Sequence, residues 1–201
     1  MAIIVVGGHS RSVGKTSVVA GLIAALPEYG WTAMKITQYG HGICSRSGKS
    51  CHCASEDHTW AIAEEQNRSG KSDTSRFLLA GARHVWWVRT EQGRLDEAMP
   101  TVQCKLADSE NAILESNSIL KFIRPDLYLT ILDPATADFK NSAQEALGLA
   151  DAIILHDRNG KSAWTAVSLK SLEGRPTFRI QPPKYLNDEI IGFVKKKLGA
   201  T

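Results

Sequence analysis

A Gly-rich segment that joins an apolar run to a helical pattern constrains this chain more than any other feature. Residues 5–17 read Val-Val-Gly-Gly-His-Ser-Arg-Ser-Val-Gly-Lys-Thr-Ser. The run at residues 2–6 is short and β-branched, as buried parallel strands are, and residues 17–26 carry apolar residues at helical spacing. A Gly-rich turn between a strand and a helix gathers backbone N–H groups at the positive end of the helix dipole. The segment therefore predicts a loop that binds a polyphosphate.

Positions in this loop have expected roles toward a nucleotide. Lys15 is expected to reach the terminal phosphates, and the hydroxyl of Thr16 is expected to bind Mg²⁺. Five residues separate Gly8 from the Gly-Lys-Thr tripeptide, whereas the common pattern has four, so the loop is a variant. The predicted phosphate ligands are Gly8, His9, Ser10, Arg11, Ser12, Val13, Gly14, Lys15, Thr16 and Ser17.

Length and composition limit the classes of protein that this chain can represent. Its 201 residues can bury one sizeable core, and we expect one domain over residues 1–201. Charged residues make up 22% and the net charge is +3, so neither nucleic acid nor a membrane is an expected partner. No apolar run approaches the roughly 20 residues that cross a bilayer, and the first strand enters the loop without a signal peptide. We therefore expect a cytoplasmic protein.

Strand and helix patterns alternate, which is typical of an α/β protein with a doubly wound, mainly parallel sheet flanked by helices. Strands are predicted at residues 2–6, 31–37, 84–89, 111–115, 127–132, 152–156 and 177–180, with an additional edge strand at 163–168. Helices are predicted at residues 17–26, 74–82, 95–107, 119–123, 142–149 and 188–198, and Pro100 is expected to interrupt or offset the third. An insertion at about residues 38–73 is longer than an ordinary connection and contains a predicted short helix at 58–66.

Two carboxylates and one lysine stand at the ends of predicted strands, where open α/β sheets bind their ligands. Glu115 and Asp133 each end an apolar run. Each is a candidate for holding Mg²⁺, with a helix cap or a loop charge as the alternative. Lys35 leaves the second strand beside the loop and is expected, with Lys15, to neutralise phosphate or an anionic substrate during catalysis. An exposed lysine at a strand end is the alternative for Lys35.

The segment at residues 70–76 reads Gly-Lys-Ser-Asp-Thr-Ser-Arg at the start of a predicted helix. Asp73 is a suitable N-cap for that helix. Arg76 lies three residues later, close to Asp73 on a helix surface, and can face an anionic ligand that Asp73 orients. Both residues are therefore candidates for the nucleotide site, and helix capping alone is the other interpretation.

Three of the four cysteines are crowded into the insertion, in a pattern unlike a secreted disulfide framework. Thiolates and imidazoles in a polar loop are typical ligands of zinc or iron. The spacing matches none of the recurrent zinc patterns, so a redox-sensitive loop or ordinary loop residues are the alternatives. The candidate metal ligands are Cys44, Cys51 and Cys53, with His52 or His58 as the fourth.

Taken together, these motifs resemble a branch of P-loop NTPases that includes dethiobiotin synthetase and the molybdopterin-guanine dinucleotide biosynthesis protein B. The longer phosphate loop resembles that of dethiobiotin synthetase, as does the spacing of Lys35 and Gly40. Residues 71–76, with Ala-Gly-Ala at 80–82, are similar to a motif of the molybdopterin protein. Glu115 falls where both families carry a glutamate that serves Mg²⁺. The Cys-His-Cys segment belongs to neither pattern.

The resemblance implies Mg²⁺ with ATP or GTP as the cofactor, a homodimer, and a role in cofactor biosynthesis. One hypothesis is a slow NTPase or adaptor that works with a partner protein, like the molybdopterin protein. The other is an ATP-dependent ligase or kinase that acts on a small anionic substrate, like dethiobiotin synthetase. No Asn-Lys-x-Asp guanine motif follows residue 155, and Asn159 is the candidate contact to the base.

Overall fold

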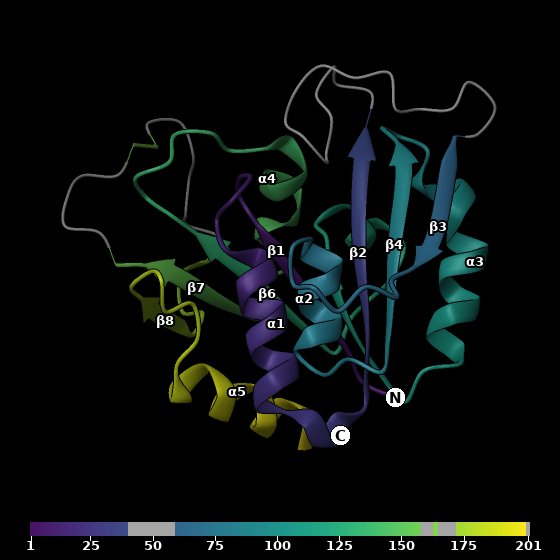
Figure 1. Cartoon of the computed structure of the whole chain (residues 1–201). Helices are drawn as coiled ribbons and strands as arrows, with labels where there is room; N and C mark the ends of the chain where they lie inside the picture. Colours follow the sequence, from purple (N-terminus) through teal and green to yellow (C-terminus); the bar gives the residue numbers. More distant parts are fainter. Residues whose placement is uncertain (40–58, 158–162, 165–171, 200–201) are drawn as a thin grey trace.

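One β-sheet forms the centre of the molecule (Figure 1). The computed structural model describes residues 1–39, 59–157, 163–164 and 172–199 of the chain. Eight strands lie in the order β3-β4-β2-β5-β1-β6-β7-β8. All neighbouring strands run parallel except β3 and β4, which are antiparallel. The strands are β1 (Ile3–Gly8), β2 (Trp31–Tyr39), β3 (Trp60–Glu64), β4 (His84–Glu91), β5 (Asn111–Glu115), β6 (Leu127–Leu132), β7 (Ala152–His156) and β8 (Thr177–Ile180).

Helices cover both faces of this sheet, which confirms the predicted α/β class. Helices α1, α2 and α5 contribute to one apolar core, and α3 and α4 contribute to the other. The helices are α1 (Lys15–Ala25), α2 (Asp73–Leu79), α3 (Leu95–Ala107), α4 (Asn141–Leu147) and α5 (Asp188–Gly199), with short 3₁₀ turns at Pro27–Tyr29 and Ser118–Lys121. Among the helices of the described ranges, none is both long and apolar enough to cross a lipid bilayer.

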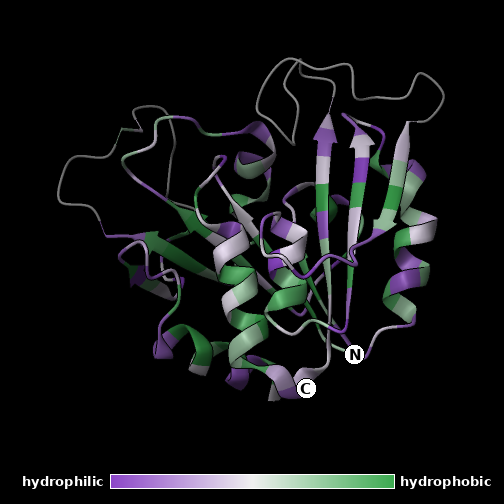
Figure 2. Cartoon of the chain, viewed as in Figure 1, coloured by the Kyte–Doolittle hydropathy of each residue, from purple (hydrophilic) through white to green (hydrophobic). Residues whose placement is uncertain are grey.

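Successive residues of the central strands alternate between the two cores. Ile4 and Val6 of β1 pack with α1 and α5, whereas Val5 packs on the opposite face. Because both faces are covered, the strand is apolar along its whole length and not only at every second residue. Figure 2 shows this hydrophobic character along β7.

The sheet places the carboxyl ends of its central strands side by side. Val6 and Lys35 are both register partners of Glu115, so the ends of β1, β2 and β5 meet at one edge. Gly8 lies beside Ile131 of β6 on the other side of β1. The loop that follows β1 is therefore surrounded by the ends of three neighbouring strands, at the position where open α/β sheets bind ligands.

Two predicted elements differ in the structure. The helix predicted at residues 58–66 is wrong, because this segment contains the edge strand β3, which pairs with β4. Trp60 and Ile62 alternate with alanines and pack against the second core, and this tertiary packing overrides the helical propensity of an Ala- and Glu-containing segment. Pro100 does not interrupt α3, which continues to Ala107.

The additional strand predicted at residues 163–168 falls mainly on residues that the structure does not describe. Its first two residues, Ala163 and Trp164, are described and do not lie in a strand. Trp164 instead donates its indole N–H to the carbonyl oxygen of Thr136 at 2.7 Å. The inserted Cys- and His-containing part of the chain, residues 40–58, also lies outside the described ranges.

Candidate functional site

The segment between β1 and α1 forms a tight loop that turns directly into the helix. Gly14 has a left-handed backbone (φ 99°), as does Ser12 (φ 56°), and α1 begins at the next residue, Lys15. The left-handed φ favours glycine at position 14. Within the described part of the chain, no side chain caps the start of α1. The first N–H groups of that helix are therefore available to an anion.

Asn117, two residues after β5, holds the beginning of this loop. The N–H of Gly8 donates to Oδ1 of Asn117 at 2.9 Å, and Nδ2 of Asn117 donates to the carbonyl oxygen of Gly8 at 2.9 Å. A Cβ at position 8 would lie 2.7 Å from Cγ1 of Val13 and 3.1 Å from the carbonyl oxygen of Ile131. The close approach of the loop residue Val13 and of β6 therefore requires glycine here.

His9 supports the loop from behind. Its backbone N–H donates to the carbonyl oxygen of Ile131 at 3.2 Å, and its own carbonyl accepts the N–H of Lys140 at 2.9 Å. Its fully buried ring packs against the rings of Phe139 and Trp164, with centroids 5.2 and 5.0 Å away, and burial lowers the pKa of the imidazole. The N–H of His9 is thus engaged with the sheet, and its ring belongs to an aromatic cluster.

Lys15 lies folded back over the loop. Its Nζ donates to the carbonyl oxygen of Ser10 at 2.6 Å. Burial lowers the pKa of Lys15 to about 8, because removing the ammonium group from water disfavours its charged form. A bound polyphosphate would stabilise that charge, so this lysine is poised to pair with an anion.

A network of four side chains lies next to Lys15. The hydroxyl of Thr16 donates to Oε2 of Glu115 at 2.7 Å. Nζ of Lys35 lies 2.7 Å from Oε1 of Glu115 and 2.7 Å from Oδ2 of Asp73. The Thr16 hydroxyl and the Glu115 carboxylate thus converge, and such hard oxygen donors are the ligands that Mg²⁺ prefers. Glu115 is only 5% exposed, so its two partners hold it in a fixed place.

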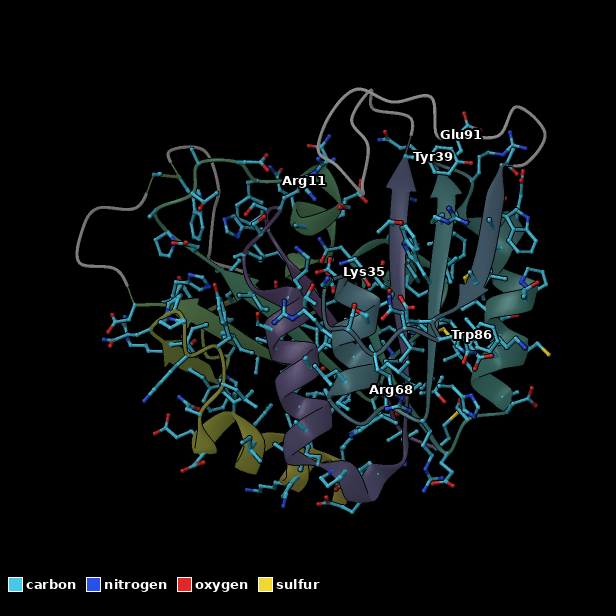
Figure 3. The ribbon with its side chains drawn as sticks, viewed as in Figure 1. Arg11, Lys35, Tyr39, Arg68, Trp86 and Glu91 are labelled. Carbon is cyan, nitrogen blue, oxygen red and sulfur yellow. The ribbon has the colours of Figure 1, made fainter. Side chains whose placement is uncertain are left out.

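The charge of Lys35 is stabilised within this network. Burial lowers the pKa of Lys35, but the neighbouring carboxylates of Glu115 and Asp73 raise it by more, and the net pKa lies above the ordinary value. The pairing with Glu115 follows from the sheet, since the two residues are register partners on β2 and β5. Figure 3 shows Lys35 on β2 beside α2, with Arg11 on the phosphate loop above it.

The start of α2 differs from its prediction in a way that affects the site. The N-cap is Ser72, not Asp73: Ser72 accepts the N–H of Ser75 at 3.1 Å and forms a reciprocal capping box with it. Asp73 occupies the first helical position, and its carboxylate contacts Lys35. Arg76 donates to the hydroxyl of Ser17 on α1 at 3.0 Å, so α2 contributes both residues to the site and aims them at different partners.

An open cleft of about 970 Å³ connects these residues. Five of its side chains are cationic and three are anionic, so the cleft favours a ligand with several negative charges. Burial and the neighbouring Arg11 lower the pKa of Lys140, which adds a partly desolvated lysine to one wall. The lining consists of Arg11, Ser12, Gly14, Lys15, Thr16, Ser17, Lys35, Ile36, Thr37, Gln38, Asp73, Arg76, Gln92, Glu115, Ser116, Asn117, Ser118, Asp138, Phe139, Lys140, Asn141, Ser142 and Tyr185.

The structure places the two candidate carboxylates, Glu115 and Asp133, in different surroundings. Glu115 lies against Thr16 in the cleft, as given above. Asp133 lies outside the cleft lining: its Oδ2 is 3.1 Å from Nδ1 of His156, and its Oδ1 accepts the N–H of Ala135 at 3.0 Å. Glu115 is therefore the carboxylate that the geometry places beside the Mg²⁺ candidate Thr16.

Sequence reasoning missed four residues that shape the loop and cleft: Asn117, Lys140, His156 and Tyr185. Each is distant from the loop in sequence and reaches it only through the strand order. The ring of Tyr185, for example, packs directly on Cα of Gly14 and would collide with any side chain there. The only available signal was position, since Asn117 and His156 stand at or just past the ends of predicted strands.

Several candidate residues fall outside the described ranges. These are the possible metal ligands Cys44, Cys51, Cys53, His52 and His58, and the candidate base contact Asn159. Among the residues that are described, no group of three or more His, Cys, Asp or Glu side chains is arranged to hold a metal ion.

The parallel sheet, the Gly-rich turn into α1 and the Lys-Thr pair at its start define the fold of the P-loop NTPases, in a divergent form with a lengthened loop. Comparison with solved structures supports the same fold. HypB, a hydrogenase maturation factor from Archaeoglobus fulgidus, aligns over 98% of this chain and 90% of its own, with 12% identity and a TM-score of 0.52.

LpxK from Aquifex aeolicus, solved with ATP, aligns over 89% of this chain at 19% identity and a TM-score of 0.50; this alignment covers 53% of LpxK. A MobB homologue from Bacillus stearothermophilus aligns over the full length of both chains with 15% identity and a TM-score of 0.47. No protein-family model and no curated protein sequence matches this chain.

Proposed function

We propose that this chain binds a Mg²⁺–nucleoside triphosphate in the cleft at Gly14–Lys15–Thr16, and that it acts as a slow NTPase or adaptor in cofactor biosynthesis. The observation that carries the proposal is the convergence of Thr16, Glu115 and Lys35 beside the free start of α1. The helix start supplies N–H groups for phosphate, and the hydroxyl and carboxylate supply hard ligands for Mg²⁺. ATP and GTP both fit this description.

Slow hydrolysis is supported by the state of the two cleft carboxylates that lie against Lys35. Glu115 and Asp73 are both paired with Lys35. A carboxylate in an ion pair is a weak base for activating a water molecule. Lys35 and Lys15 are instead suited to stabilising negative charge on a phosphoryl group, which favours tight binding of the triphosphate.

A second candidate function is an ATP-dependent ligase or kinase that acts on a small anionic substrate. The observation that favours it is the extent of the cleft, which continues beyond Lys35 to Gln38, Gln92 and Ser118. These neutral side chains can donate and accept hydrogen bonds to a second molecule next to the terminal phosphate.

Metal analysis of the purified protein discriminates between the two functions. Zinc or iron that the wild type retains and a Cys51→Ala/Cys53→Ala double variant loses would favour the adaptor, and a metal-free protein would favour the ligase or kinase.

Calorimetric titration with MgATP and MgGTP tests the nucleotide site. We expect saturable binding of at least one of them to the wild type and loss of at least about tenfold in affinity in Lys15→Ala, because a charged contact to phosphate is removed. The matched control is Lys196→Ala, an exposed lysine on α5 whose removal should leave the affinity unchanged. Equal affinity of the wild type and Lys15→Ala would refute the assignment of the loop.

A further inference from the structure

A buried His–Asp pair lies behind the phosphate loop and is not used by the proposed function. His156 ends β7 and Asp133 follows β6, and the two residues are 3% and 6% exposed. Nδ1 of His156 lies 3.1 Å from Oδ2 of Asp133. Neither residue lines the cleft. Burying two ionisable groups is unfavourable unless each has a compensating partner, so the pair calls for an explanation.

The other side of the imidazole contacts the loop. Nε2 of His156 lies 3.0 Å from the carbonyl oxygen of Val13, a residue 143 positions earlier in the chain. A carbonyl oxygen can only accept, so Nε2 must carry a proton and donate it. On the opposite side of the ring, Nδ1 lies 3.1 Å from Oδ2 of Asp133, so the imidazole lies between that carboxylate and the carbonyl of Val13. His156 therefore links the end of β6 to the peptide that precedes Gly14.

The hydrogen bond from His156 to Val13 also affects the direction of the backbone N–H of Gly14. In a trans peptide the C=O and the N–H of the same plane point in opposite directions. When His156 draws the carbonyl of Val13 behind the loop, the N–H of Gly14 is turned to the opposite side. Tyr185 restrains the same peptide, because its ring packs on Cα of Gly14 and lies 5.8 Å from the ring of His156.

We propose that His156 is a positioning residue for the phosphate loop: by donating to Val13 it aims the N–H of Gly14 at the triphosphate, with Asp133 against the other side of the ring. This inference rests on the proposed function, since it assumes that a triphosphate binds at the loop. It adds a residue from β7, distant from the loop in sequence, whose only route to the ligand is through the backbone. Removing its donor should weaken the binding of phosphate groups even though no ligand contact of a side chain is lost.

Three substitutions separate the donor from the bulk of the side chain. His156→Gln places an amide N–H near the position of Nε2 and retains the donor to Val13. His156→Asn places its amide near Nδ1 and is too short to reach Val13, and His156→Leu removes every donor. The matched control is His84→Leu, which removes an exposed histidine on β4 that pairs with Glu64. The probe is inorganic tripolyphosphate with Mg²⁺, which lacks a base, and MgATP and MgGTP are titrated alongside it.

We expect His156→Asn and His156→Leu to bind Mg²⁺–tripolyphosphate about tenfold more weakly than the wild type, the equivalent of about one hydrogen bond, and His156→Gln to bind within about threefold of it. Affinity near the wild-type value in His156→Asn, or binding by His156→Gln as weak as that of His156→Asn, would overturn the inference. If the His156→Leu variant does not fold, the comparison of His156→Gln with His156→Asn carries the test. A wild type that binds neither tripolyphosphate nor nucleotide would overturn the proposed function itself, which distinguishes the two failures.

Discussion

The buried ion pair between Lys35 and Glu115 allows a prediction of stability that can be worked from its geometry. Replacing Glu115 with Gln removes the charge from a side chain that holds Lys35 and Thr16 at 2.7 Å each. Breaking a buried pair from one side costs about 3–5 kcal/mol. Because Lys35 keeps its contact with the half-exposed Asp73, we expect a smaller loss, of about 2–3 kcal/mol, in the free energy of unfolding. For a chain of this size that corresponds to a fall in Tm of about 4–12 °C.

A double-mutant cycle with Lys35→Met separates the pair from its surroundings. Each single variant leaves one charged side chain of the Lys35–Glu115 pair without the other, whereas the double variant removes both charges. The destabilisation of the double variant should therefore be smaller than the sum of the singles by about 1–3 kcal/mol, measured by urea unfolding at pH 7. The control is Glu145→Gln, which removes an exposed pair with Lys121 and should cost less than about 1 kcal/mol. Additive singles, or a Glu115→Gln effect as small as the control, would refute the reasoning.

Three further predictions follow from the loop and from α2. Because burial lowers the pKa of Lys15 to about 8, triphosphate binding above pH 8 should take up a proton, and Kd should rise by up to about tenfold per pH unit. Calorimetry in buffers of different ionisation heat measures this uptake, and Lys15→Arg, which stays charged, should abolish it. Asn117→Ala leaves both backbone groups of Gly8 unpaired and should lower nucleotide affinity about tenfold by calorimetry; an unchanged Kd would contradict this. Ser72→Ala removes the N-cap of α2 and should lower the free energy of unfolding, measured with urea, by about 1 kcal/mol. An unchanged free energy of unfolding would show that the capping box does not stabilise the protein.

The central strands could be predicted because their residues are apolar on both sides. The predicted bounds at 111–115, 127–132 and 152–156 match the structure, since these runs end where the chain leaves the covered sheet. The bounds at 177–180 also match, although this strand, β8, lies at the edge of the sheet. The edge strand β3 could not be predicted in the same way. It is covered on one side by partly buried Trp60 and Ile62, and its conformation depends on pairing with β4, a segment more than 20 residues later.

The residues of the site also fall into two groups, those that local sequence predicts and those whose contacts depend on the tertiary fold. Lys15, Thr16 and Glu115 could be selected from local sequence, because a Gly-Lys-Thr turn and a carboxylate at a strand end carry their own signals. The partner of Asp73 could not: a local rule favours Asp as an N-cap, but Ser72 caps α2 and leaves Asp73 to pair with Lys35. Contacts such as Asn117 with Gly8 depend on β5 and β1 lying side by side, which strand order decides and local sequence does not.

The Mg²⁺ dependence of nucleotide binding tests the central claim most directly, because it involves the loop and Glu115 together. Calorimetric titration of the wild type with ATP and with GTP, each in excess Mg²⁺ and then in EDTA, gives the four affinities on one preparation. We predict one saturable site per chain for at least one nucleotide, with at least about tenfold tighter binding in Mg²⁺. Absence of binding to both nucleotides in Mg²⁺, or affinities that EDTA leaves unchanged, would contradict the proposed Mg²⁺–triphosphate site.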